Sequence, residues 1–256
     1  MPAQLTAAKS QAILYILISI LVAMTSVAFL PENSWWHFYS LIPAYTALFM
    51  LLATGAINDP EAVAGLGVHR FSFAHWPLAF LFGLLPVLAI WFVAMRMGAT
   101  SQEGVVALLS KMAYLVPSFA LTAFGEEIGF RGYWLPRLAD LGRFKTTLIT
   151  GTLWGIWHWP LFFVGFESTG GDLLFKIAIF MMTIFPVTFI LNELRMRTGS
   201  IWPGTVYHCI INVSMVAFFG STETTSTMVE VGGSVVSVLI AATWLVRTTR
   251  REPVRE

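Results

Sequence analysis

Three short segments of the chain combine ionisable and amide side chains at spacings that suit acid–base chemistry. They are Glu126-Glu127-x-x-x-Arg131, Trp154-x-x-x-His158 and His208-x-x-x-Asn212. A carboxylate and a histidine can take a proton from water, which turns the water into a nucleophile. A second histidine and a carboxamide can donate hydrogen bonds to a developing oxyanion. Together the three segments therefore predict hydrolysis by an activated water molecule.

The first segment contains two adjacent glutamates, and we expect them to have different roles. On a helix, Glu127 and Arg131 are four residues apart and share a face, so they can pair and neutralise each other. Glu126 points about 100° away around the helix, and its neighbour one turn later is Phe130. We therefore expect Glu127 and Arg131 to form a supporting ion pair at a helix end near the membrane interface. Glu126 is then the carboxylate that is free to act as a general base.

The two histidines have different expected roles. His208 and Asn212 are four residues apart on one face, so their side chains can supply two hydrogen-bond donors in one direction. His158 has no polar neighbour within one turn of its own helix, so its partner must come from another helix. Cys209 is the single cysteine of the chain, and we expect it to serve in packing.

Glu126, His158 and His208 also form an alternative zinc set by ligand type, because two histidines and one glutamate are a known catalytic combination. No HExxH or HxxxH spacing occurs in the chain, and the three ligands would have to come from three helices. Activation of water by a glutamate and a histidine without a metal explains the same residues. We therefore expect no cofactor, and zinc held by these three residues is the alternative.

The composition places these residues in a membrane. Of the 256 residues, 57% are hydrophobic and 11% are charged, and the mean hydropathy is +0.74. A soluble domain carries about 25% charged residues, so we expect a bilayer to be the solvent for most of the chain. The same figures exclude an intrinsically disordered chain, a disulfide framework and, with a net charge of +1, a nucleic-acid binder.

Apolar stretches of about 20 residues, the length that a helix needs to cross a bilayer, occur eight times. They cover roughly 11–30, 38–57, 75–95, 106–130, 146–166, 173–193, 201–219 and 231–247. We therefore predict an all-α, polytopic membrane protein with a single membrane domain over residues 1–256. The three motifs lie within about 120–215, and the stretch 58–74 is expected to lie along the membrane interface.

The positive charges between the spans predict the orientation. With both termini in the cytoplasm, twelve of the 15 Lys and Arg residues fall in cytoplasmic segments. The other three, Arg96, Lys111 and Lys176, fall on the opposite side. Cytoplasmic segments of membrane proteins are enriched in Lys and Arg. We therefore expect eight helices with both termini cytoplasmic.

The motif residues are expected at one depth. At 1.5 Å per residue from the cytoplasmic helix ends, Glu126 lies at about 14 Å, His158 at about 18 Å and His208 at about 12 Å. Pro160 lacks an N–H, so it frees the carbonyl of Ile156 and is expected to kink the helix beside His158. These positions predict a single internal site towards the cytoplasmic side.

In these three motifs and in their order, the chain resembles the CPBP intramembrane proteases, also called CAAX-processing or Abi-type membrane proteases. The second motif of that family usually begins with Phe, whereas this chain has Trp154. The resemblance implies an eight-helix protease of a bacterial-type plasma membrane, with its site open to the cytoplasm and a glutamate-driven rather than zinc-driven mechanism. Eukaryotic members cleave a tripeptide from prenylated C-termini, and many others are linked to bacteriocin self-immunity or peptide maturation.

The resemblance also implies a role for each motif residue. By this resemblance, Glu126 and His158 activate the water molecule. His208 and Asn212 form the oxyanion site, and Glu127 and Arg131 have a supporting role. The implied partners are a peptide or protein substrate and the lipid bilayer. The sequence predicts neither the identity of the substrate nor the oligomeric state.

Two other functions stay open from the sequence. The first is a non-catalytic immunity or scaffold protein that keeps the polar cluster for helix packing. The second is a proton-coupled transporter that uses Glu126 and the two histidines as a relay. The absence of an obvious internal repeat, and of polar groups in the outer leaflet, argues against the transporter.

Overall fold

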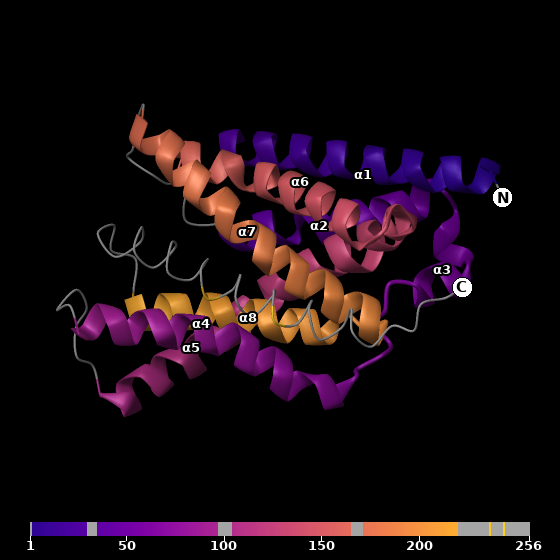
Figure 1. Cartoon of the computed structure of the whole chain (residues 1–256). Coiled ribbons are helices and arrows are strands. Elements are labelled where there is room, and N and C mark those ends of the chain that lie inside the picture. Colours follow the sequence, from indigo (N-terminus) through magenta and orange to yellow (C-terminus); the bar gives the residue numbers. More distant parts are fainter. Residues whose placement is uncertain are drawn as a thin grey trace.

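The computed structural model describes residues 2–29, 35–96, 104–164 and 171–219, together with Val236 and Thr243. Every regular element within these residues is a helix, which confirms the predicted all-α class. The long helices are α1 (Pro2–Phe29), α2 (Trp35–Ala53), α4 (Trp76–Arg96), α5 (Val105–Glu127), α6 (Arg143–Val164), α7 (Gly171–Thr198) and α8 (Trp202–Phe219). Figure 1 shows them as one bundle of elongated helices.

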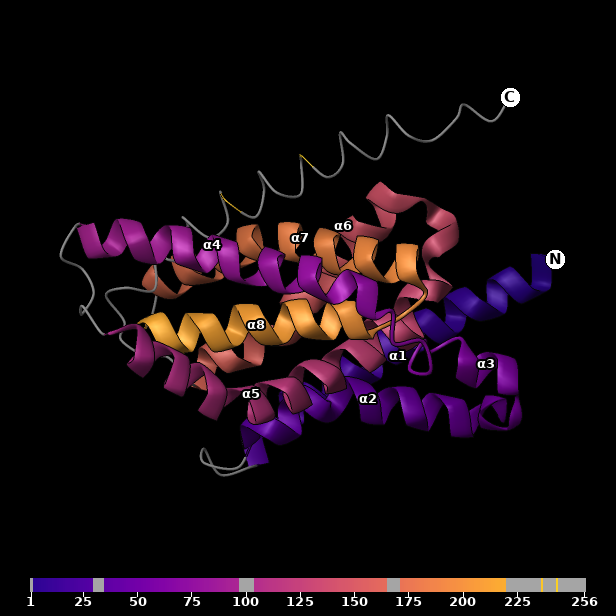
Figure 2. The same cartoon turned by 90° about the horizontal axis from the view of Figure 1, so that it is seen from below.

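Seven of the eight predicted spans coincide with these long helices, and the eighth, 231–247, lies outside the described residues. The stretch 58–74 contains the short helix α3 (Pro60–Ala64), which lies in both views at the same end of the bundle as the start of α1 (Figures 1 and 2). Asp59 starts α3 by accepting a hydrogen bond from the backbone N–H of Glu61.

Four of the described helices are long and apolar enough to cross a membrane. They cover Ala7–Phe29, Phe73–Arg96, Val105–Arg137 and Leu173–Thr198. The helices α6 and α8, which carry the polar residues of the second and third motifs, are not among these four. The total number of spans and the side of the termini stay predictions.

The helix contacts run in a closed circuit. Helix α8 packs against α5 and α7, α5 packs against α2, α2 packs against α1, and α6 packs against both α1 and α7. Helix α4 lies along α8 outside this circuit (Figure 2). This order brings the three motif-bearing helices, α5, α6 and α8, towards one interior.

Two glycines allow the end of α5 and the turn that follows it to lie directly on α2. A Cβ at Gly125 would lie 2.8 Å from the carbonyl oxygen of Ser40, and one at Gly129 would lie 2.4 Å from the carbonyl carbon of Pro43. Beyond Glu127 the chain continues as a π-helix over Ile128–Trp134, a wide turn that is frequent at functional sites. Glu126 and Glu127 therefore lie where the end of α5 is in close contact with α2.

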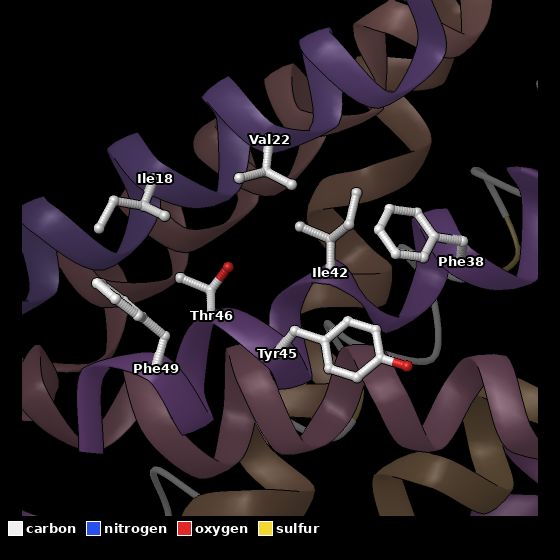
Figure 3. Close-up of a pocket in the computed structure, with 7 residues that line it drawn as sticks. All are labelled: Ile18, Val22, Phe38, Ile42, Tyr45, Thr46 and Phe49. Atoms are coloured by element: carbon white, nitrogen blue, oxygen red, sulfur yellow. The ribbon is translucent and has the colours of Figure 1, made fainter. Parts of the chain in front are cut away.

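The outer faces of the helices carry large apolar side chains, as a lipid-facing surface does. Leu17 and Leu21 on α1 are 59% and 62% exposed, and Phe92 on α4 is 58% exposed. Between α1 and α2 lies an apolar groove of about 410 Å³ (Figure 3), lined by Ile18, Val22, Phe38, Ile42, Tyr45, Thr46 and Phe49. These surfaces suit hydrocarbon rather than water.

Candidate active site

One cavity of about 350 Å³ is lined by four of the residues that the sequence singled out. Glu126 comes from the last turn of α5, His158 from the middle of α6, and His208 and Asn212 from α8. The rest of the lining is almost entirely apolar, and α4 and α7 contribute to it. The structure therefore brings together at one place the groups that the sequence placed at one depth.

Glu126 and His158 face each other in this cavity. Glu126 is 5% exposed, and its Oε2 lies 4.0 Å from Nε2 of His158. Nδ1 of His158 lies 2.8 Å from the carbonyl oxygen of Trp154. Because a carbonyl only accepts, this nitrogen carries a hydrogen, and Nε2 of the neutral ring is then an acceptor. A water oxygen can lie at about 2.8 Å from both Oε2 and Nε2 and donate one hydrogen to each.

Glu127 contacts both Arg131, an expected supporting residue, and His208, an expected catalytic residue. Its Oε1 lies 3.2 Å from Nη1 of Arg131 and 3.0 Å from Nδ1 of His208. The ion pair predicted from the i, i+4 spacing is therefore present. Both side chains are buried inside the protein, since Glu127 is 0% and Arg131 is 2% exposed, and the depth of the pair relative to the membrane stays a prediction. Helix α8 covers the pair: a Cβ at Gly204 would lie 3.2 Å from Oε2 of Glu127.

The hydrogen bond to Glu127 leaves Nε2 as the free nitrogen of His208. A carboxylate oxygen only accepts, so Nδ1 of His208 carries the hydrogen of this bond. The free nitrogen belongs to a side chain that lines the cavity, as does the half-buried carboxamide of Asn212 one turn further along α8. When the ring is doubly protonated, Nε2 is also a donor, so His208 and Asn212 can together supply two donors.

The middle of the chain matches a known family. The family described as Rce1-like, the type II CAAX prenyl endopeptidases, matches residues 107–214, which include all three motifs. This match supports the resemblance of the matched region to the CPBP family. A similar protein is CAAX prenyl protease 2 from Methanococcus maripaludis, which is 29% identical over 100 residues. That alignment covers 37% of this chain and 36% of the archaeal protein, so the chain matches only about a third of its relative's length.

Trp154 contributes more to this site than the sequence indicated. Its indole Nε1 donates to Oε2 of Glu126 over 3.1 Å, and its backbone carbonyl accepts from His158. The guanidinium carbon of Arg131 lies 4.2 Å from the centre of its ring. In the sequence, Trp154 is recognisable only as the aromatic residue of the second motif. Its spacing to His158 predicted a shared helix face, but the contact with Glu126 depends on how α5 and α6 pack.

The alternative zinc set, Glu126, His158 and His208, fits a zinc ion by donor type but not by arrangement. Glu126, His158 and His208 each keep an oxygen or a nitrogen next to the cavity, and Glu127 holds the second nitrogen of His208 as an outer-sphere carboxylate does in zinc sites. Across the described ranges, however, no three His, Cys, Asp or Glu side chains converge closely enough to hold a metal ion. The zinc alternative therefore stays a question for metal analysis.

Proposed function

We propose that this chain is an intramembrane endopeptidase that hydrolyses peptide bonds near the cytoplasmic face of the membrane. The observation that carries the proposal is the pair of acceptors, Glu126 Oε2 and His158 Nε2, 4.0 Å apart within an apolar cavity. Few polar residues are tolerated in such surroundings unless they have a function. The similarity to CAAX prenyl endopeptidases supports the same reaction.

In the first step Glu126 and His158 hold a water molecule by its two hydrogens. Its lone pair is then directed away from both side chains, towards a peptide carbonyl in the cavity. A bond forms between the water oxygen and the carbonyl carbon, and Glu126 takes one proton of the water. The carbonyl electrons move to oxygen, where the oxyanion receives hydrogen bonds from Nε2 of the doubly protonated His208 and from the carboxamide of Asn212.

In the second step the tetrahedral intermediate collapses. The bond between carbon and nitrogen breaks while Glu126 returns its proton to the leaving nitrogen. The products are an amine and a carboxylic acid, which ionises in water. Glu127 and Arg131 take no part in proton transfer, and Glu127 holds the ring of His208 in place.

We infer that the substrates are membrane-associated or C-terminal peptides. The apolar lining of the cavity favours apolar side chains next to the cleaved bond. The name of the archaeal relative, a CAAX prenyl protease, supports a C-terminal peptide. We further infer a bacterial-type plasma membrane with both termini cytoplasmic, which the distribution of Lys and Arg supports.

The test uses the purified full chain in detergent. The probes are a fluorogenic C-terminal peptide with a thioether-linked isoprenoid on its cysteine, the same peptide without the lipid, and a soluble unstructured protein. We expect cleavage of at least one C-terminal peptide, and loss of that cleavage in Glu126→Gln and His158→Ala. The matched control is Glu61→Gln on the exposed surface of α3, which should keep full activity.

Two results would contradict the proposal. One is full activity in a folded Glu126→Gln protein, because the general base would then lie elsewhere. The other is no cleavage of any probe by the wild-type chain together with unchanged biological function in Glu126→Gln, which favours the scaffold alternative. Comparison of the two C-terminal peptides shows whether a lipid on the substrate matters.

A further inference from the structure

Trp154 contacts both members of the water-activating pair, although its side chain has no acid–base chemistry of its own. Its indole donates a hydrogen bond to Glu126, and its backbone carbonyl accepts one from His158. We propose that Trp154 is a positioning residue that sets the geometry between these two groups. This inference rests on the proposed function, since it concerns the same site.

The chemical identity of the atoms fixes the direction of both hydrogen bonds. An indole N–H only donates and a backbone carbonyl only accepts. The indole therefore holds Oε2 of Glu126, and the carbonyl holds Nδ1 of His158. The oxygen held by the indole is the same Oε2 that lies 4.0 Å from Nε2 of His158. One residue thus aims the two acceptors that face each other across the site.

The indole is itself fixed by its neighbours. Trp154 is 2% exposed, and the guanidinium of Arg131 lies over its ring face at 4.2 Å. The ring of His208 meets it edge to face, with centroids 5.5 Å apart and an interplanar angle of 83°. A buried donor needs a partner, and the hydrogen bond to Glu126 supplies the one that the indole N–H has.

Loss of this hydrogen bond should affect the reaction through the position of the Glu126 carboxylate. Without the indole N–H, the carboxylate of Glu126 can rotate about its terminal bond, and neither of its two equivalent oxygens is then held towards His158. Misplacement of a catalytic group by about 1 Å can lower a rate about 100-fold. Because the substrate does not need this hydrogen bond in order to bind, the loss should appear in kcat rather than in KM.

The test separates the N–H group of Trp154 from its shape. The first variant carries 3-benzothienylalanine at position 154, which keeps the bicyclic ring and replaces the N–H by sulfur. The second is Trp154→Phe, which removes the donor and part of the ring. The matched control carries 3-benzothienylalanine at Trp91 of α4, where the indole packs on Phe218 outside the cavity. All are assayed with the peptide that the wild-type chain cleaves best.

We expect both variants at position 154 to lose about tenfold or more in kcat, with KM within about twofold, because the lost hydrogen bond goes to a charged group. The control at Trp91 should keep the wild-type kcat. Full activity of the benzothienyl variant would overturn the inference, because shape alone would then account for the role of Trp154. A rise in KM at constant kcat would also overturn it, because it would make Trp154 a substrate contact.

A second measurement does not depend on activity. The infrared difference spectrum between wild type and Glu126→Gln should contain an indole N–H band that shifts when its acceptor changes from a carboxylate to an amide. The same band should be absent from the spectrum of the benzothienyl variant. If no N–H band changes, the contact does not exist and the inference fails, whatever the protein cleaves. If the band shifts but no peptide is cleaved, the contact stands and the proposed function fails.

Discussion

Nδ1 of His208 lies 3.0 Å from Oε1 of Glu127, the same oxygen that lies 3.2 Å from Nη1 of Arg131. One carboxylate oxygen therefore connects the histidine that lines the cavity with a fully buried guanidinium. Glu126, the next residue, contacts Trp154 and His158 instead. The two glutamates are adjacent on one helix, but their side chains contact different partners.

The buried pair predicts a large effect of Arg131 on stability. In Arg131→Ala the Glu127 carboxylate stays buried with one partner fewer, and breaking a buried pair in this way costs about 3–5 kcal/mol. We expect a loss of that size in the free energy of unfolding, measured by denaturant titration in detergent. The matched control is Lys9→Ala, which breaks an ion pair to Asp140 whose side chains are 43% and 37% exposed. That change should cost at most about 1 kcal/mol, and equal effects of the two would argue against the buried pair.

The proposed oxyanion site predicts a kinetic effect without a stability effect. Removal of one donor from such a site lowers kcat by about 100- to 1,000-fold. We expect this loss in Asn212→Ala, with KM little changed, in an assay of peptide cleavage. Cys209→Ala on the same helix is the control, because its sulfur faces the carbonyl of Val116 at 3.9 Å. A normal kcat in Asn212→Ala would exclude this residue from the oxyanion site.

The contact between the π-helix and α2 predicts that Gly129 tolerates no side chain. In Gly129→Ala the new Cβ would lie 2.4 Å from the carbonyl carbon of Pro43, so the two helices have to separate. Overpacking of this kind costs about 1–3 kcal/mol, and it should also lower activity because Glu126 moves with α5. Gly104→Ala is the control, since no atom lies within 4 Å of the Cβ that it would add. Equal melting temperatures of the two variants would contradict the close approach.

The metal-free mechanism predicts that chelation leaves activity unchanged. Purified protein is incubated with a membrane-permeant zinc chelator, and cleavage is measured before and after the chelator is removed. Elemental analysis of the same preparation gives the zinc content per chain. Loss of activity that returns on addition of zinc, together with about one zinc per chain in the wild type and less in His208→Ala, would support the zinc alternative.

Local spacing predicted the parts of the site that depend on one helix. The pair of Glu127 and Arg131 follows from their separation by four residues, and so does the shared face of His208 and Asn212. Hydropathy placed seven long helices correctly among the described residues. The common depth of the motifs predicted that they share one site, and the cavity brings Glu126, His158 and His208 together.

The contacts between helices could not be predicted from the sequence. The bond between Glu127 and His208 joins residues 81 positions apart, and that between Trp154 and Glu126 joins residues 28 positions apart. Each depends on the rotation of a helix about its axis, which packing decides. The π-helix after Glu127 was also not predicted, because an apolar run has no signal that distinguishes a wide turn from a regular one. The burial of the ion pair between Glu127 and Arg131 was not predicted either, because it depends on how α8 packs over the pair.

The close approach at Gly125 and Gly129 restricts how the protein can take in a peptide. Helix α5 already touches the backbone of α2, so it has no space to retreat when the cavity fills. The base Glu126 therefore lies on a helix end that is packed closely against its neighbour. Widening of the cavity has to come from the opposite side, where α4 and α7 present apolar side chains. Cross-links that tie α4 to α8 should slow peptide uptake, whereas cross-links that tie α5 to α2 should leave it unchanged.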